Sequence, residues 1–230
     1  MGGHLDKVVV SIGGSILIPG NGDSAFIKEL AAMIEGLSED VQMVIVCGGG
    51  RTARYYADTG RALGGTDYQL DVLGIGATRL NAQLLSLALG SMPETVPETA
   101  EDAARLSSPG RIVVMGGTVP GHTTDAVAMM VARELGAERV VNATSVDAVY
   151  SEDPKKNPCA RRFECMTIEE LGEVVYKDHR ASECCVFDPL GVRIAREGRI
   201  DICMVDGRDL PELRNAILGR PIRGTYVRSR

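Results

Sequence analysis

The chain lacks the features that mark membrane and secreted proteins. None of its apolar runs approaches the roughly 18 to 20 residues that a membrane-spanning helix needs. The N-terminus, MGGHLDKVVV, lacks the basic region and the apolar region of a secretory signal peptide, and it has Asp6 where an N-myristoylation motif requires Ser or Thr. We therefore expect a cytoplasmic protein that does not bind membranes.

Paired cysteines and excess positive charge are also missing. The six cysteines, at positions 47, 159, 165, 184, 185 and 203, contain no CxxC pair, so we expect reduced thiols that act as small apolar residues. The net charge of -6 gives no general attraction to nucleic acid, which we therefore exclude as a partner. Any bound phosphate must be held by a local cluster of hydrogen-bond donors.

Short β-branched runs alternate with helical patterns along the chain. The runs, which show no polar alternation, are residues 7–11, 42–47, 111–115, 139–143 and 200–205. The helical patterns between them are residues 24–37, 51–63, 74–89 and 125–135. Continuous apolar strands separated by helices predict an α/β fold whose mainly parallel central sheet is covered on both faces.

Three of these predicted strands end in glycine. Gly13-Gly14-Ser15 follows the first, Gly48-Gly49-Gly50 the second, and Gly116-Gly117-Thr118 the third. Ligands of open α/β sheets sit beyond the carboxyl ends of the strands, and glycine there lets backbone N–H groups approach them. The three loops predict a shared anion site.

Familiar phosphate motifs do not fit this chain. It contains no Gly-Lys dipeptide, so it has no Walker A loop. The near match to a dinucleotide fingerprint at residues 74–79 lacks the third glycine and a preceding strand, and DHRAS at 178–182 lacks the order of a protein-kinase catalytic loop. What remains is a phosphate site built from glycine loops, helix N-termini and scattered cations.

The candidate cations lie in two places. Arg51 and Arg54 are three residues apart on one predicted helix that follows the GGG loop, and Lys155 and Lys156 lie in a proline-bounded loop. Before these lysines, the stretch NATSVDAVYSEDP supplies a polar wall suited to a ribose or a purine base.

The motifs together resemble one family. VVVSIGGSIL, VIVCGGGRTARYY, DVLGIGATRLNAQLL, VMGGTVPGHTTDAVA, NATSVDAVYSEDPKKNP and FDPLGVRIAREGRIDICMVDG occur in the order and spacing of the amino acid kinase superfamily, and they are most similar to its archaeal-type uridylate (UMP) kinases. The resemblance runs from about Lys7 to the C-terminus. It implies one domain over residues 1–230, folded as a three-layer α/β/α sandwich with an acceptor-binding lobe at about 1–137 and an ATP-binding lobe at about 138–230.

The resemblance also implies an activity and a site. The expected reaction is transfer of the γ-phosphoryl group of ATP to UMP, with Mg2+ held mainly by the ATP phosphates, in a homohexamer built as a trimer of dimers. The residues expected to bind ATP are Gly13, Gly14, Ser15, Gly50, Arg54, Thr144, Ser145, Tyr150, Asp153 and Lys156. The residues expected to bind UMP are Gly49, Asp71, Thr118, Val119, Pro120, Gly121, His122, Thr123 and Thr124. The residues expected to act in catalysis are Lys156, Asp125 and Arg54.

Elementary chemistry supports several of these roles. A carboxylate such as Asp71 can accept hydrogen bonds from two ribose hydroxyls, and threonines before a helix place hydroxyl and N–H donors where the helix dipole favours an anion. His122 is expected to be a binding contact, because the phosphate of a nucleotide needs no general base near pH 7. Many members of the family that the chain resembles have a lysine at the place of Ser11. Either Lys156, Arg54 or the more distant Lys7 supplies that charge, or backbone groups and Mg2+ stabilise the transition state, and our choice is Lys156.

Two alternatives stay open at this point. The same fold could serve a kinase for isopentenyl phosphate, carbamate or an amino-acid carboxylate, or a non-catalytic protein that binds nucleotides or oxyanions. Composition and spacing alone reach only a phosphate-binding α/β protein.

Overall fold

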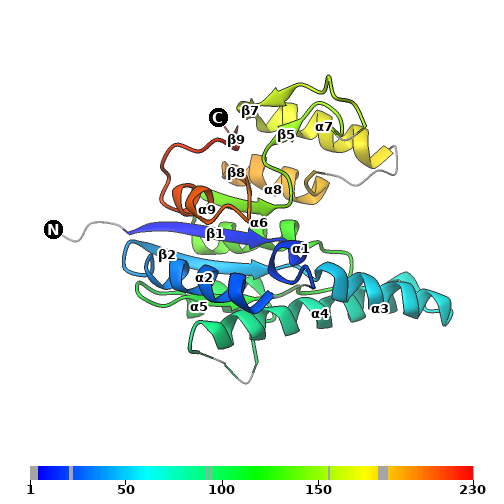
Figure 1. Cartoon of the computed structure of the whole chain (residues 1–230), viewed down its shortest axis with the longest axis vertical. Helices are drawn as coiled ribbons and strands as arrows, with labels where there is room; N and C mark the ends of the chain where they lie inside the picture. Colours follow the sequence, from blue (N-terminus) through cyan, green and yellow to red (C-terminus); the bar gives the residue numbers. More distant parts are fainter. Residues whose placement is uncertain are drawn as a thin grey trace.

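The computed structural model describes residues 5–20, 23–91, 93, 95–154, 156–180 and 186–229, with the side chains of 177–180 left out (Figure 1). Within these residues the chain forms a seven-stranded sheet of order β3-β2-β1-β4-β8-β9-β7. Its strands, in chain order, are β1 (Asp6–Ile12), β2 (Val41–Cys47), β3 (Val113–Met115), β4 (Arg139–Thr144), β7 (Cys165–Thr167), β8 (Asp201–Asp206) and β9 (Thr225–Arg228). Every neighbouring pair is parallel except β8 and β9. The predicted mainly parallel sheet is confirmed.

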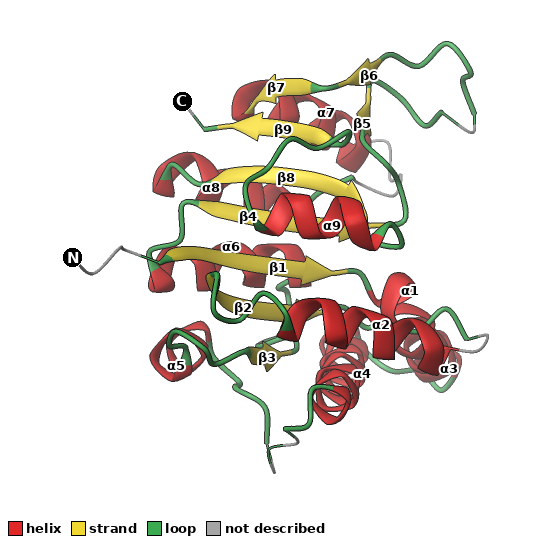
Figure 2. Cartoon of the chain, turned by 60° about the vertical axis from the view of Figure 1, so that its left-hand side comes forward, coloured by secondary structure: helices red, strands yellow, loops and turns green. Residues whose placement is uncertain are grey.

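The central strands are apolar because both of their faces are covered. Val9 of β1 pairs with Val44 on one side and with Val140 on the other, and all three side chains are fully buried. A strand buried on both faces has no solvent side, so its sequence shows no alternation. A separate antiparallel pair of short strands, β5 (Val149–Tyr150) with β6 (Arg162–Phe163), lies beside β7 and β9 in Figure 2.

Helices form a layer on each face of the sheet (Figure 2). One apolar core contains side chains of α1 (Gly14–Leu17), α2 (Asp23–Glu35), α4 (Asp67–Ala88) and α9 (Leu210–Ile217). The other contains side chains of α5 (Ala100–Leu106), α6 (Thr124–Leu135), α7 (Ile168–Arg180) and α8 (Pro189–Gly198). These layers confirm the expected sandwich. None of the described helices has the length and apolar content that crossing a bilayer requires.

Helix α3 (Gly50–Ala62) packs on α4 outside both layers, and the two helices project from the body as an arm (Figure 1). None of the residues of α3 is buried. Helix α3 therefore adds no side chain to either core and is held to the body through its contact with α4.

Helix α4 begins two turns earlier than the sequence pattern predicts. Thr66 and Gln69 form a capping box: the Thr66 hydroxyl accepts from the Gln69 N–H, and the Gln69 side chain accepts from the Thr66 N–H at 2.9 Å. The helix then continues through Gly74 and Gly76. The near match to a dinucleotide fingerprint therefore lies inside a helix, where it cannot form a phosphate-binding turn.

The cysteines agree with the prediction only in part. Cys47 and Cys203 are buried free thiols, whereas Cys159 and Cys165 are exposed free thiols rather than core residues. Cys184 and Cys185 lie outside the described residues.

Candidate functional site

The first two glycine loops touch each other through their backbones. A Cβ atom on Gly14 would lie 2.1 Å from the backbone nitrogen of Gly50, and one on Gly50 would lie 2.4 Å from the Gly14 carbonyl carbon. Gly50 also has a φ of +57°, in the left-handed region. Side chains are excluded at both positions, so bare backbone from two strand ends meets at one edge of the sheet.

The third glycine loop and the end of β4 reach the same edge. Strands β3, β2, β1 and β4 are parallel neighbours, so their carboxyl ends point in one direction. The Gly13 N–H donates to the carbonyl of Ala143 at 2.9 Å, which joins the first loop to the end of β4. The predicted sharing of one edge is confirmed, and the anion itself stays a prediction.

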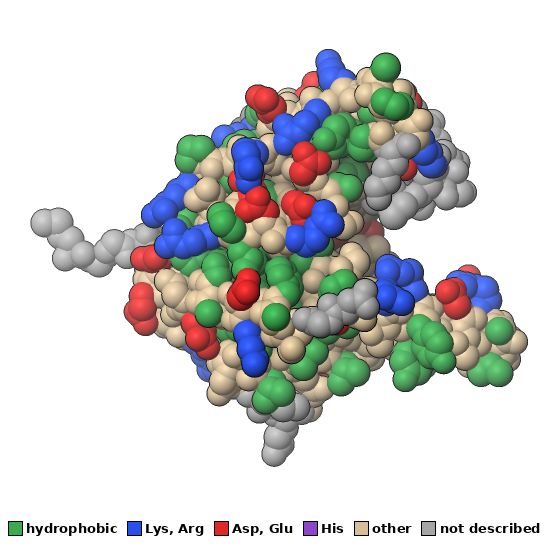
Figure 3. Space-filling model, viewed as in Figure 1, with side chains coloured by type: hydrophobic (Ala, Val, Ile, Leu, Met, Phe, Trp, Pro, Cys, Tyr) green, Lys and Arg blue, Asp and Glu red, His purple; other side chains and the backbone are tan. Residues whose placement is uncertain are grey.

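A cavity of about 550 Å³ opens beside these loops, between α3, α4 and the segment 117–124. In Figure 3 the surface is hollowed between the α3–α4 arm and the upper part of the molecule. The predicted UMP-binding residues that line the cavity are Asp71, Val119, Gly121, His122, Thr123 and Thr124. Arg54 lines it as well, whereas Gly49, Thr118 and Pro120 are not among its lining residues.

Asp71 holds the segment 117–124 as well as lining the cavity. It lies on α4 rather than in a loop, and its Oδ2 accepts a 2.8 Å hydrogen bond from the Gly121 N–H. The other carboxylate oxygen, Oδ1, has no partner among the described residues. One oxygen thus fixes the segment and the other is free for a ligand hydroxyl.

Two further residues of α4 anchor the glycine loops, and motif reasoning missed both. The Thr78 hydroxyl accepts a 2.6 Å hydrogen bond from the Gly117 N–H. The Asn81 amide donates to the carbonyl oxygens of Gly48 and Gly49 at 2.8 and 3.3 Å. Their only signal in the sequence is that both lie on the helix that also carries Asp71.

The N-terminus of α6 points at the cavity. Thr123 is its N-cap: the hydroxyl accepts from the Ala126 N–H at 3.2 Å and donates to Asp188 Oδ2 at 2.8 Å. Asp188 in turn caps α8 through the Gly191 N–H at 2.9 Å. Because the Thr123 hydroxyl proton is engaged, the hydroxyl of Thr124, the first helical residue, is the better placed donor for an anion.

Ser11 and Asp125 form the polar floor between β1 and α6. The Ser11 hydroxyl donates to Asp125 Oδ1 at 3.0 Å, and Ser11 itself is buried. Burial raises the pKa of the Asp125 carboxyl to about 6; the Ser11 hydrogen bond opposes this shift and the nearby Asp188 carboxylate adds to it. The carboxyl therefore titrates only slightly below neutral pH.

The structure separates the candidate cations. Lys7 donates to the Leu135 carbonyl at the far end of α6, which removes it as the replacement for a lysine at position 11. Arg51 donates to the Pro19 carbonyl at 2.9 Å, although the sequence placed it with Arg54. Of the two arginines, only Arg54 lines the cavity.

His122 has an unusual environment for a surface loop. Its Nδ1 is buried without a hydrogen-bond partner among the described residues, while its backbone N–H donates to the Val119 carbonyl at 3.3 Å. An unpaired buried ring nitrogen fits a contact completed by a ligand.

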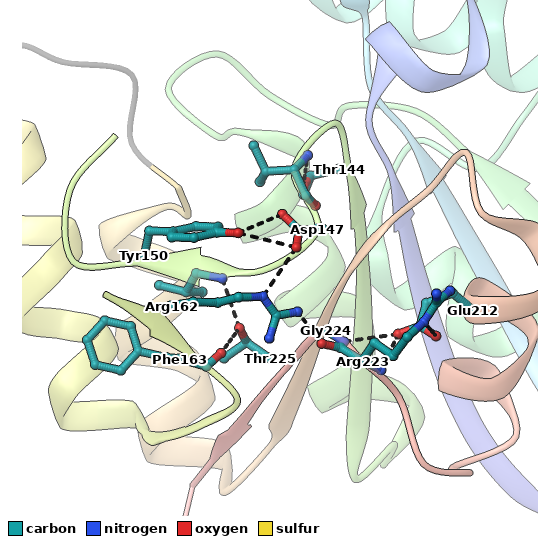
Figure 4. A network of polar contacts seen from close by, with 11 residues as sticks. Thr144, Asp147, Tyr150, Arg162, Phe163, Glu212, Arg223, Gly224 and Thr225 are labelled. Atoms are coloured by element: carbon teal, nitrogen blue, oxygen red, sulfur yellow. Dashed lines mark hydrogen bonds and ion pairs between the residues drawn. The ribbon is translucent and has the colours of Figure 1, made fainter. Parts of the chain in front are cut away.

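The predicted nucleotide-binding wall follows β4 (Figure 4). The Tyr150 hydroxyl donates to the Asp147 carboxylate at 3.1 and 3.3 Å, and Arg162 Nε donates to the same carboxylate at 3.2 Å. The Thr144 hydroxyl bonds both the N–H and the carbonyl of Val146 at 3.1 Å. Tyr150 is therefore held in one orientation by its own turn.

The buried carboxylate of Glu212 is linked to this wall through hydrogen bonds. Glu212 accepts from the backbone N–H groups of Arg223 and Gly224 at 2.5 and 2.9 Å (Figure 4). Arg162 also donates to the Arg223 carbonyl, so the network links the β5–β6 pair to the segment before β9.

The loop with the remaining predicted residues lies apart from the cavity. The Lys156 N–H donates to the Asp153 carbonyl at 3.0 Å, and neither residue lines the cavity. Lys155 lies outside the described residues. The structure brings Arg54 and Asp71 together but does not bring Lys156 to them, so the catalytic role of Lys156 stays a prediction.

Comparisons with known proteins agree with this geometry. Residues 6–206 match the amino acid kinase family. The chain is 41% identical over 222 residues to a protein named uridylate kinase from Methanococcoides burtonii, covering 96% of this chain and 94% of that one. It is 40% identical over 223 residues to a uridylate kinase from Archaeoglobus fulgidus, covering 96% and 99%.

Solved structures give the same result for the fold. The crystal structure of the uridylate kinase from Archaeoglobus fulgidus superposes with a TM-score of 0.85 at 38% identity, covering 96% of this chain and 99% of that one. A UMP kinase structure from Bacillus anthracis gives a TM-score of 0.80 at 21% identity, covering 97% and 96%, and shows the shared fold alone.

Proposed function

The chain belongs to the amino acid kinase family, and on this premise we propose that it is a uridylate kinase, which transfers the γ-phosphoryl group of ATP to UMP and yields ADP and UDP in pyrimidine nucleotide synthesis. One observation carries the proposal beyond the names of its relatives. Asp71, Arg54 and the N-terminus of α6 line a single cavity next to the glycine loops. A carboxylate suits ribose hydroxyls, and a guanidinium with a helix N-terminus suits a phosphate.

The cavity and the glycine loops define the proposed mechanism. Asp71 Oδ1 holds the ribose and Thr124 holds the acceptor phosphate, one oxygen of which attacks the γ-phosphorus. Arg54, expected to bind the ATP phosphates, lines the same cavity and supplies positive charge for the transferred group. The bond from that phosphorus to the bridging oxygen of ATP breaks, and ADP leaves. Backbone N–H groups at Gly14 and Gly50 stabilise the charge in transit. The acceptor oxygen is already largely deprotonated, so His122 acts as a binding contact and carries no proton.

Magnesium enters this proposal as a cation held mainly by the phosphates of ATP. Mg2+ usually keeps several waters and binds through substrate phosphates and one or two carboxylates. Among the described residues there is no cluster of three or more His, Cys, Asp or Glu side chains able to hold a metal. The carboxylates of Asp125 and Asp188 lie close together and could supply one or two ligands to such a cation.

The ATP site is proposed in the second half of the chain. We assign residues 1–137 to an acceptor-binding lobe and 138–230 to an ATP-binding lobe, with Thr144, Ser145, Tyr150 and Asp153 around the nucleoside and Lys156 as the cation for the phosphates. The rigid placement of Tyr150 by Asp147 supports this assignment. We also propose that the protein acts in the cytoplasm.

The arm formed by α3 and α4 supports the proposed homohexamer. Its exposed large apolar side chains form two groups along the arm, one near its tip and one along the other end of α4. The tip group is Tyr55, Tyr56, Leu63, Tyr68, Val72 and Leu73, and the α4 group is Leu80, Leu84 and Leu87. Exposed apolar patches of this kind mark interfaces, and a trimer of dimers needs two kinds of contact.

A panel of acceptors tests the proposed function. The purified protein is given Mg-ATP with UMP, CMP, dUMP, AMP or isopentenyl phosphate, and ADP release is measured by a coupled assay. We expect turnover with UMP far above the rest. Preferred turnover of isopentenyl phosphate would instead support a different small-molecule kinase, and tight ATP binding without turnover would support a non-catalytic nucleotide-binding protein.

A further inference from the structure

Arg79 on α4 holds two successive carbonyl groups of the segment that follows β3. Its Nε donates to the Gly117 carbonyl at 3.2 Å, and one terminal nitrogen donates to the Thr118 carbonyl at 3.1 Å. The other terminal nitrogen pairs with Glu98 at 2.9 Å. All three guanidinium nitrogens of a partly buried arginine are thus engaged, and two of them are directed at one short stretch of backbone.

These two hydrogen bonds fix the direction of two N–H groups. A trans peptide is planar, so its N–H points opposite to its carbonyl. The peptides whose carbonyls face Arg79 carry the N–H groups of Thr118 and Val119, which must therefore point away from Arg79. Neither N–H donates to any residue that the structure describes. Gly117 and Val119, on either side of Thr118, line the cavity, so the two free donors belong to a segment that borders it.

Helix α4 packs directly against the backbone at the end of β3. A Cβ atom on Gly116 would lie 2.6 Å from the backbone nitrogen of Arg79, so α4 and the strand end approach as closely as backbones can. Thr78 holds the preceding peptide through the Gly117 N–H. Three successive peptides are therefore set by two adjacent residues of one helix.

We propose that Arg79 is a positioning residue for the phosphoryl acceptor: by holding the carbonyls of Gly117 and Thr118 it presents the N–H groups of Thr118 and Val119 to the acceptor nucleotide. This inference rests on the proposed function, because it assigns the cavity to that substrate. Arg79 does not line the cavity and acts only through the backbone. The planar fork of an arginine can reach two carbonyls at once, which a lysine cannot do.

Steady-state kinetics of variants test the proposal. We expect Arg79→Ala to raise the KM for UMP about tenfold or more, the equivalent of losing roughly one to two hydrogen bonds, with the KM for ATP and kcat changed by less than about threefold. Arg79→Lys should resemble Arg79→Ala. Guanidinium chloride at low millimolar concentration should restore part of the UMP affinity of Arg79→Ala, because it can refill the space between the two carbonyls.

Two controls separate positioning from general stability. Arg105→Ala removes an ion-paired arginine from α5, outside the cavity lining, and should leave both KM values unchanged. Amide hydrogen exchange supplies a readout without catalysis: adding UMP should protect the Thr118 and Val119 amides in the wild-type protein and protect them less in Arg79→Lys.

Each outcome decides the question. A wild-type enzyme that phosphorylates UMP while both Arg79 variants keep its KM overturns the inference and leaves the proposed function standing. A wild-type protein that does not phosphorylate UMP overturns the proposed function instead. If Arg79→Ala does not fold, Arg79→Lys decides, since it retains the aliphatic stem and the charge. Equal amide protection in Arg79→Lys and wild type also overturns the inference.

Discussion

The Ser11 hydroxyl donates a 3.0 Å hydrogen bond to Asp125 Oδ1, which joins the end of β1 to the first turn of α6. At the place where the family resemblance led us to expect a lysine, this chain therefore meets the partly buried Asp125 carboxyl with a neutral hydroxyl. A hydroxyl donor offsets part of the cost of burying the charge but adds no counter-charge.

This arrangement predicts a stability that depends on pH. The folded-state pKa of Asp125, about 6, is above the usual aspartate value of 3.8, so the folded protein binds the proton more tightly than the unfolded chain does. Stability from this group is present at low pH and is lost as the pH rises from about 4 to about 6. Above that range the buried charge costs up to about 3 kcal/mol.

The variant Asp125→Asn removes this titration. Relative to wild type, it should gain free energy of unfolding as the pH rises from about 4 to about 6 and show a constant difference above about pH 7, while its kinase activity falls. Urea denaturation at a series of pH values measures the difference. A difference that does not change with pH would show that the Asp125 carboxyl is not perturbed.

Arg54 and Arg51 of α3 form a matched pair of variants that tests the predicted catalytic role of Arg54. Arg54 lines the cavity, whereas Arg51, one turn earlier, donates to the Pro19 carbonyl. We expect Arg54→Ala to lower kcat/KM for UMP by about 100-fold or more, because it removes a charged donor from the site, and Arg51→Ala to change it by less than about threefold. Equal losses in the two variants would show that α3 matters only for structure.

Lys156 is our choice for the charge that is missing at Ser11, and the structure leaves it outside the cavity lining. We expect Lys156→Ala to lower kcat by about 100-fold with little change in the KM for UMP. The control is Lys28→Ala, which removes an exposed lysine from α2. Nearly normal turnover of Lys156→Ala would transfer the role to Arg54 and the backbone donors.

Asp71 is predicted to hold the ribose of the acceptor. Asp71→Ala should raise the KM for UMP strongly, about tenfold to 100-fold, since it removes both the ribose contact and the anchor of the Gly121 N–H. The KM for ATP should stay within about threefold, as should both constants in Asp58→Ala, which removes an exposed acid from α3. Unchanged UMP kinetics in Asp71→Ala would refute the acceptor assignment.

The exposed apolar groups on the arm predict the assembly. Leu63 is 84% exposed at the end of α3, and Leu84 and Leu87 lie on the second group along α4. Leu63→Glu should break one kind of contact and a double change of Leu84 and Leu87 to Glu the other, each leaving a dimer or a trimer, and all three changes together should give monomers. Light scattering after size-exclusion chromatography measures the mass. A wild-type monomer would contradict the hexamer.

Local sequence was sufficient to predict much of the sheet and its glycine loops. β-branched runs identified β1, β2, β4 and β8 to within about a residue at each end, because the sequence of a strand buried on both faces is a continuous apolar segment. The strand of β3 proved shorter than predicted, at Val113–Met115. The glycines after β1 and β2 followed from the same reasoning, since only bare backbone permits the contact between Gly14 and Gly50.

Other elements gave too weak a local signal. Strands β7 and β9 are only a few residues long and lie at the far side of the sheet, where the antiparallel pairing of β9 with β8 depends on a buried carboxylate, Glu212, that holds the segment before it. Helix α8 begins at an Asp188-Pro189 start signal, which the strand-and-helix prediction did not include.

The sequence by itself determined the fold class, the edge of the sheet where the glycine loops meet, and the residue types that a phosphate site needs. Only the tertiary structure decided which of those residues face the site. Arg51 and Arg54 share a helix yet have different surroundings. Lys7 donates to the C-terminal end of α6, away from the cavity. Arg79 contacts a segment nearly forty residues away in the chain. Local periodicity records which side of an element is buried, whereas the partner of a polar side chain depends on how distant segments pack.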